Sequence, residues 1–160
     1  MTPPGMTPPG NFSWVETDRL AASAYPYTLA NLQWLRNEGI DLIITLTEDE
    51  LDKGLLNQTG LLNVHIPIPD MTAPSLDQLV LSNQMIQKAN SAGMKVNVHC
   101  LYGQGRTGTV LAAYLIGLGF PLEEAIQRIR QQRPGSIETA NQELRLRQFA
   151  SHIAASKSNQ

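Results

Sequence analysis

The chain has 160 residues, of which 42% are hydrophobic and 16% charged, and its formal net charge is −2 at pH 7. This length suits one compact domain and leaves little room for a second. The small negative charge gives no general attraction to nucleic acid or anionic membranes, so any anion must bind at a local site. No apolar run reaches the roughly eighteen residues needed to cross a bilayer, and the first residues lack the layout of a signal peptide.

These features lead us to expect a cytoplasmic protein. The single cysteine, Cys100, cannot form an intramolecular disulfide, which agrees with a reducing compartment and leaves the thiol free for chemistry. The chain opens with the tandem pentapeptide MTPPGMTPPG, which is unable to bury apolar surface. We therefore expect a disordered leader at residues 1–10, one domain at 11–155 and a flexible tail at 156–160.

From residue 11 on, the apolar pattern alternates between the periods of a strand and a helix. In chain order it predicts two short strands within 11–24 around a turn at Thr17 and Asp18, a helix between Thr28 and Gly39, strands at 40–46 and 63–68, a helix between Ser75 and Gly93, a strand at 95–99, and helices at 107–119, 121–133 and 139–155. Such alternation implies right-handed crossovers and an α/β fold, with a central, mainly parallel sheet flanked by helices.

The predicted strand at 95–99 runs directly into HCLYGQGRTG, residues 99–108. In parallel sheets ligands bind beyond the carboxyl ends of the strands, which is where Cys100 lies. Gly103 and Gly105 free the backbone to curl, so that the N–H groups of this short loop face one point. Converging N–H groups and the positive end of a helix dipole form a site for a tetrahedral oxyanion.

Arg106 adds a planar fork that holds two phosphate oxygens at once. The same electric field favours the thiolate of Cys100, which places a nucleophile inside a phosphate site and implies attack on phosphorus. The alternative is that Cys100 is a small buried apolar residue at a strand end. Five matching residue types at set positions around the cysteine have a chance frequency on the order of one in a million, which favours the functional interpretation.

The stretch HCLYGQGRTG resembles the signature loop of cysteine-dependent protein phosphatases, HC-x5-R-[ST], and the chain length resembles the small dual-specificity branch. Four further stretches resemble the atypical, VH1-like members of that branch: NFSWV at 11–15, RLA at 19–21, IPIPD at 66–70 and RPGSIET at 133–139. The resemblance implies the protein tyrosine phosphatase-like fold and hydrolysis through a phosphocysteine on Cys100, with no metal and no cofactor.

A phosphocysteine mechanism needs an acid for the leaving oxygen and then a base for water. Asp70 is the candidate, since it follows the strand predicted at 63–68 in the loop IPDMTAPS, where family members carry their general acid. Its alternative is an ordinary turn aspartate or a helix-start acid. Thr107 stands where the family uses a hydroxyl to hydrogen-bond the cysteine sulfur; its alternative is a threonine that satisfies local backbone.

The remaining expected site residues surround this loop. His99 is expected to hydrogen-bond the backbone around Cys100. Gln142 shares an inward helical face, and related phosphatases place a glutamine there to orient water, but the spacing from Thr139 equally fits a capping box. The residues expected to bind the substrate phosphate are Leu101, Tyr102, Gly103, Gln104, Gly105 and Arg106.

Other polar residues are weaker candidates for the site. His65 and His152 are expected to be structural, and no histidine has metal-ligand spacing with a second cysteine. The helix dipole already explains Arg128 and Arg130, which leaves Arg133 as a modest candidate beside PGSIET.

The substrate follows from the resemblance. A short chain without the recognition loop of large tyrosine-specific domains implies a shallow pocket for phosphotyrosine, and also for phosphoserine and phosphothreonine, on phosphorylated protein substrates. The expected protein is a monomer without nucleic-acid or membrane partners, and its loop lacks the lysines of phosphoinositide phosphatases. Two alternatives remain: an RNA 5′-triphosphatase, which needs a broader basic surface, and a non-catalytic phosphate-binding module.

Overall fold

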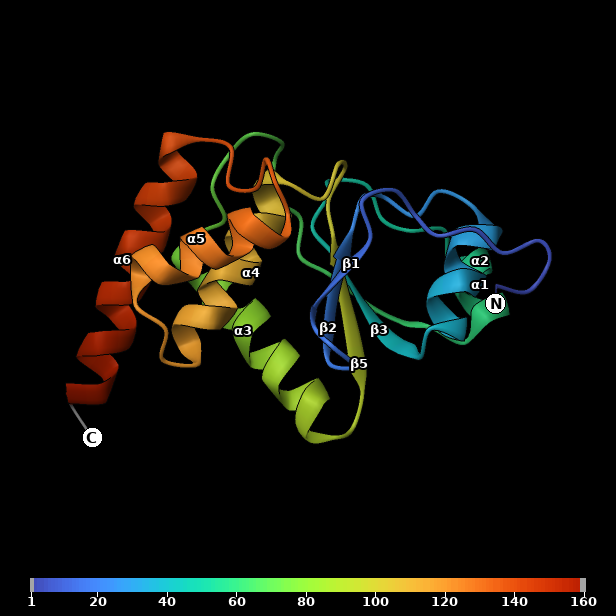
Figure 1. Cartoon of the computed structure of the whole chain (residues 1–160), viewed down its shortest axis with the longest axis horizontal. Coiled ribbons are helices and arrows are strands. Elements are labelled where there is room, and N and C mark those ends of the chain that lie inside the picture. Colours follow the sequence, from blue (N-terminus) through green and yellow to red (C-terminus); the bar gives the residue numbers. More distant parts are fainter. Residues whose placement is uncertain (1, 159–160) are drawn as a thin grey trace.

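A five-stranded β-sheet divides the molecule into two unequal layers of helices (Figure 1). The computed structural model describes residues 2–158. The strands are β1 (Ser13–Glu16), β2 (Leu20–Ser23), β3 (Ile40–Thr45), β4 (Leu62–His65) and β5 (Lys95–His99). The helices are α1 (Leu29–Asn37), α2 (Lys53–Thr59), α3 (Leu76–Ser91), α4 (Gly105–Gly117), α5 (Leu122–Gln132) and α6 (Ala140–Ser158). This alternation confirms the predicted α/β class.

The strand order is β1-β2-β5-β3-β4. The hairpin β1–β2 is antiparallel, and the pairings β2–β5, β5–β3 and β3–β4 are parallel, which confirms a mainly parallel sheet. Ser23 of β2 and Thr45 of β3 both pair with His99 of β5. The carboxyl ends of three neighbouring strands therefore meet at one edge, with Cys100 directly beyond it.

Helices cover both faces of the sheet. One face packs against α1 and α2, and the other against α3 to α6 (Figure 1). Val96 and Val98 of β5 belong to the larger core, on the α3 to α6 side. Because side chains alternate along a strand, His99 faces the α1 layer, whereas Cys100 belongs to the larger core under α4.

Local capping explains most helix boundaries. Thr28 caps α1 by accepting a hydrogen bond from the N–H of Asn31, and Ser75 forms a capping box with Gln78 at the start of α3. Helix α2 was not predicted, because its segment buries one apolar side chain, Leu56, and so carries no apolar period.

Among the boundaries that differ from the prediction, two bear on the site. Strand β4 ends at His65 rather than at residue 68, because Pro67 has no N–H to continue the ladder; Ile66 and Ile68 still donate to carbonyl oxygens of residues 45 and 46. Helix α4 begins at Gly105, two residues before the predicted start at residue 107, and Arg106 lies in its first turn.

The ends of the chain also differ from the prediction. Residues 7–10, expected to be disordered, lie against the domain: Pro9 is buried, and Asn31 of α1 donates to the carbonyl oxygen of Thr7. Helix α6 continues to Ser158, beyond the predicted domain end at 155, and residues 1, 159 and 160 lie outside the described residues. Between residues 2 and 158, no helix is long and apolar enough to cross a membrane.

Candidate active site

The loop that follows β5 turns its carbonyl oxygens outward. Each carbonyl from residue 100 to 104 accepts a hydrogen bond. The donors are His99 Nδ1 for residue 100, Tyr25 N for residue 101, Asn11 Nδ2 for residue 102, Arg133 Nη2 for residue 103, and both Gly108 N and Ile137 N for residue 104. By contrast, the N–H groups of residues 101–106 donate to no acceptor in the part of the chain that the structure describes. A backbone arranged in this way presents its donors to a bound anion.

Two features of the chain produce this curl. Gly103 has a φ of +77°, and a Cβ there would lie 2.7 Å from the backbone carbon and oxygen of Ser23. Gln104, the N-cap of α4, makes no side-chain capping bond, which leaves the first N–H groups of a 13-residue helix open toward the loop. Cys100 is only 3% exposed at the base of this loop.

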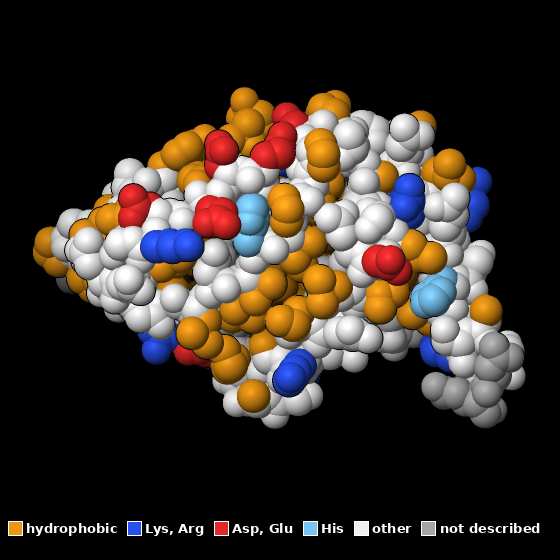
Figure 2. Space-filling model, turned by 180° about the vertical axis from the view of Figure 1, so that it is seen from behind, with side chains coloured by type: hydrophobic (Ala, Val, Ile, Leu, Met, Phe, Trp, Pro, Cys, Tyr) orange, Lys and Arg blue, Asp and Glu red, His pale blue; other side chains and the backbone are white. Residues whose placement is uncertain are grey.

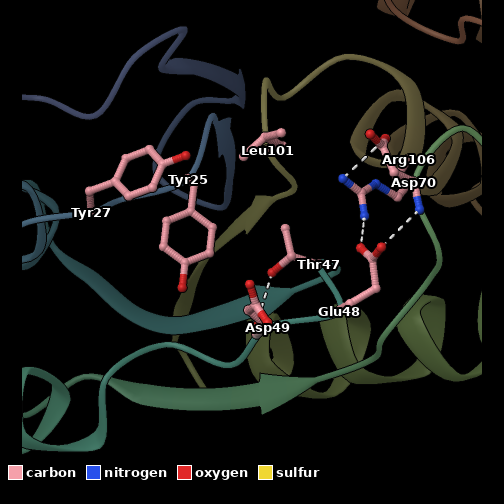
Figure 3. Close-up of a pocket in the computed structure, with 8 residues that line it drawn as sticks. All are labelled: Tyr25, Tyr27, Thr47, Glu48, Asp49, Asp70, Leu101 and Arg106. Carbon is pink, nitrogen blue, oxygen red and sulfur yellow. Dashed lines mark hydrogen bonds and ion pairs between the residues drawn. The ribbon is translucent and has the colours of Figure 1, made fainter.

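Arg106 is buried beside the loop, with 3% of its side chain exposed. Its Nη1 donates to Glu48 Oε1 at 2.7 Å and to the carbonyl oxygen of Ile68 at 2.8 Å, and its Nη2 lies 3.3 Å from Asp70 Oδ1 (Figure 3). Hydrogen bonds from the backbone N–H groups of Glu48 and Asp70, together with that from Arg106, lower the pKa of Glu48. Glu48 is therefore an ionised partner of the guanidinium at neutral pH.

Asp70 lies in the loop after β4, on the same side of the cleft as Arg106 (Figure 3). Its carboxylate accepts a hydrogen bond from the N–H of Met71 at 2.9 Å, and its own N–H donates to Glu48 Oε2 at 3.3 Å. The side chain remains 55% exposed. The structure thus brings Asp70, from the loop after β4, next to Arg106, in the first turn of α4.

A polar chain crosses the sheet and holds the backbone of Cys100. Asn63 Nδ2 donates to Thr45 Oγ1 at 2.9 Å, Thr45 lies 2.8 Å from His99 Nε2, and His99 Nδ1 lies 3.1 Å from the carbonyl oxygen of Cys100. Burial lowers the pKa of His99 to about 4, although the Cys100 carbonyl partly offsets this. A neutral imidazole donates from Nδ1 and accepts the Thr45 hydroxyl at Nε2, which completes the chain.

Arg133 holds the loop from the side of the β1–β2 hairpin. Its Nη2 donates to the carbonyl oxygen of Gly103 at 2.8 Å, and its Nη1 to Ser13 Oγ at 2.6 Å and to the carbonyl oxygen of Ala22 at 3.3 Å. Burial lowers the pKa of Arg133 to about 10, against an opposing effect of Cys100, so the guanidinium is still charged at neutral pH. Arg133 is therefore a buried cation that ties the loop to the β1–β2 hairpin.

Thr107 and Gln142 contact the loop region differently. Thr107 Oγ1 is buried and has no hydrogen-bond partner among residues 2–158. Gln142 forms the capping box with Thr139 and also donates to the carbonyl oxygen of Thr72 at 3.1 Å. Its Nε2 would be 3.1 Å from a Cβ at Gly105, so the amide that caps α6 also lies against the start of α4.

Arg106, Leu101 and Asp70 line a cleft of about 570 Å³ above this loop, and Tyr102, 67% exposed, does not line it. The cleft contains residues that the sequence analysis missed: Tyr25, Tyr27, Thr47, Glu48 and Asp49 (Figure 3). Position in the chain was an available signal. Tyr25 follows β2 by two residues and Glu48 follows β3 by three, so both reach the same sheet edge as Cys100.

Known proteins share this domain. The family model described as "PTP-SAK: Swiss Army Knife protein, DSP-PTPase phosphatase domain" matches residues 9–146. Protein tyrosine phosphatase type IVA 3 of Mus musculus is 35% identical over 108 residues, which are 66% of this chain and 62% of that protein. The Homo sapiens protein named phosphatidylglycerophosphatase and protein-tyrosine phosphatase 1 is 30% identical over 146 residues, covering 82% of this chain and 70% of that protein.

Solved structures agree with these matches. Tk-PTP in the active form is 32% identical with a TM-score of 0.82, covering 88% of this chain and 97% of that one. The crystal structure of PTPMT1 is 25% identical with the same TM-score, covering 93% and 99%. The chain therefore belongs to the dual-specificity and tyrosine phosphatase (DSP-PTPase) family, although it spans less than two thirds of the type IVA 3 relative.

Proposed function

We propose that this protein hydrolyses phosphate monoesters on phosphoproteins, phosphotyrosine and also phosphoserine and phosphothreonine, through a phosphocysteine on Cys100. The observation that carries the proposal is the segment at 100–106, whose carbonyls accept hydrogen bonds while its N–H groups after the buried Cys100 find no acceptor among residues 2–158. Arg106 lies in the first turn of α4, the helix that follows this loop. Family membership supports the same reaction.

The first step transfers the phosphoryl group to sulfur. Three phosphate oxygens accept hydrogen bonds from the loop N–H groups and Arg106, which offset the charge that develops during attack. The Cys100 thiolate forms the S–P bond while the ester P–O bond breaks, and the protonated carboxyl of Asp70 donates its proton to the leaving oxygen.

The second step releases phosphate. Asp70, now a carboxylate, takes a proton from water as the water oxygen bonds to phosphorus and the S–P bond breaks. The unpartnered hydroxyl of Thr107 is suited to donate to the departing sulfur. Gln142 is the candidate to orient this water. A thiolate that must stay reduced also supports action in a reducing compartment such as the cytoplasm, and we propose that the protein acts there as a monomer.

Hydrolysis of para-nitrophenyl phosphate by the wild type and Cys100→Ser tests the proposal. Turnover should persist with EDTA, fall with vanadate and disappear in Cys100→Ser, while the variant still binds vanadate. A folded, reduced wild type that binds vanadate without turnover would instead indicate a phosphate-binding module.

The charge around the cleft favours one phosphate over several. Glu48, Asp49 and Asp70 line the cleft beside Arg106, and no lysine from residues 2–158 does so, which disfavours a polyphosphorylated inositol lipid. On the face seen in Figure 2, lysine and arginine side chains are isolated rather than continuous, unlike the basic surface that RNA requires. Faster release of phosphate from triphosphorylated RNA or from phosphatidylglycerophosphate vesicles than from phosphopeptides would overturn the protein-substrate assignment.

A further inference from the structure

A pair of tyrosines forms the wall of the cleft opposite Arg106 and Asp70. Tyr25 and Tyr27 stand on one side of the cleft in Figure 3, and Arg106 and Asp70 on the other. The tyrosine rings are 4.6 Å apart between centroids and tilted by 39°. None of the reaction steps described above uses either ring.

Tyr25 is fixed in place on three sides. Its N–H donates to the carbonyl oxygen of Leu101 at 3.1 Å, and its hydroxyl donates to the carbonyl oxygen of Glu50 at 3.0 Å. Its ring is perpendicular to that of His99, with an interplanar angle of 87° and 5.2 Å between the ring centroids. It therefore connects the catalytic loop to the loop after β3. A ring held this firmly loses little further freedom when a ligand binds.

Tyr27 is the exposed member of the pair. Its side chain is 65% exposed, and its hydroxyl makes no hydrogen bond to any residue between 2 and 158. The backbone around it is nevertheless constrained, because the buried Pro26 precedes it and Thr28 caps α1 directly after it. Tyr27 thus presents a positioned aromatic surface to the cleft.

The depth of Cys100 makes this wall relevant to the substrate. Because Cys100 is only 3% exposed, a phosphate bound to it leaves the group that carries it in the cleft lined by the tyrosines, Leu101 and Arg106. An aromatic ring on the ester oxygen can stack on, or meet edge-on, the tyrosine rings, whereas the short side chains of phosphoserine and phosphothreonine offer no such partner.

We propose that Tyr25 and Tyr27 form an aryl-recognition wall, with Tyr25 as the anchor and Tyr27 as the contact that favours aryl over alkyl phosphate esters. This inference rests on the proposed phosphatase activity and narrows it toward phosphotyrosine.

The test compares kcat/KM for two peptides that differ only in carrying phosphotyrosine or phosphothreonine. Tyr27→Ala and Tyr27→Leu should lower the phosphotyrosine to phosphothreonine ratio by about 3- to 10-fold, through loss of phosphotyrosine turnover. Tyr27→Phe, which keeps the ring, should retain the wild-type ratio. Leu81→Ala, an exposed apolar residue on α3, is the matched control for loss of surface area.

The outcomes separate the two proposals. Wild-type protein without turnover of either peptide or of para-nitrophenyl phosphate would overturn the phosphatase assignment and this inference with it. An active wild type whose ratio is unchanged by both Tyr27→Ala and Tyr27→Leu, with unfolding midpoints near the wild type, would overturn the aryl wall alone.

Discussion

Glu48 connects Arg106 to Asp70, since one of its carboxylate oxygens accepts a hydrogen bond from Arg106 and the other from the backbone N–H of Asp70. Arg106 thus faces two carboxylates, where a bound phosphate would bring further negative charge. Glu48 both positions Arg106 and competes electrostatically with the substrate.

Removing the charge of Glu48 while keeping its oxygen should strengthen anion binding. Glu48→Gln retains an acceptor for Arg106 but loses the hydrogen bond from the Asp70 N–H, because its amide nitrogen is a donor. The guanidinium stays in place with one charge partner fewer. We expect vanadate to bind about 2- to 5-fold more tightly, as for an exposed ion pair. Inhibition titrations at pH 7 measure this, and unchanged or weaker binding would show that Glu48 acts mainly by positioning.

Replacing Arg133 should loosen the catalytic loop. Arg133→Lys keeps a charge, but one ammonium cannot serve Gly103, Ser13 and Ala22 together. We expect a loss of about 2–3 kcal/mol in the free energy of unfolding and at least about a tenfold fall in kcat/KM. Arg128→Lys, on the exposed face of α5, the helix that Arg133 follows, is the control. Equal effects of the two substitutions would contradict the role of Arg133.

Alanine substitutions at Gly103 and Gly105 should lower the free energy of unfolding by very different amounts. A Cβ at Gly103 meets the Ser23 backbone and requires a φ of +77°, so Gly103→Ala should cost about 2–4 kcal/mol of stability. A Cβ at Gly105 lies 2.5 Å from Glu138 Oε1, the end of a flexible side chain, so Gly105→Ala should cost about 1 kcal/mol or less. Urea unfolding compares them, and similar costs would mean that the loop is less constrained than its contacts indicate.

Stability should fall in acid because of His99. Its native pKa of about 4 lies below the ordinary value of 6.5, so between these pH values the unfolded chain binds a proton that the native protein does not. The stabilisation is complete above pH 6.5 and is lost toward pH 4, by on the order of 3 kcal/mol. The wild type should therefore lose more stability than His99→Asn over this range in urea titrations. Equal losses of unfolding free energy in the wild type and His99→Asn would show that groups other than His99 cause the acid sensitivity.

The parts of the site that depend on local sequence could be predicted. The spacing from Cys100 to Arg106 indicates a loop followed by the start of a helix. Asp70 lies after a recognisable strand, in a loop with a proline on each side of it. Glu48 was missed because LTEDE has the composition of a charged surface loop, and only the approach of β3 to β5 places it on Arg106.

Long-range contacts explain the other omissions. Arg133 reaches Ser13, 120 residues away along the chain, and no local pattern signals that bond. The aryl-recognition wall depends on β2 lying parallel to β5, a pairing that the sequence order does not specify. The leader contacts α1 through hydrogen bonds between Thr7 and residues 30 and 31, which composition cannot reveal.

The most direct test of the account is to trap the phosphocysteine. In Asp70→Asn with para-nitrophenyl phosphate, the first step survives because nitrophenolate leaves without an acid, whereas hydrolysis of the intermediate lacks its base. Acid-quenched samples analysed by mass spectrometry should show one phosphoryl group on the peptide containing Cys100, preceded by a burst of nitrophenolate. Turnover without a burst and without a phosphoryl group on Cys100, or turnover that survives in Cys100→Ser, would contradict the proposed mechanism.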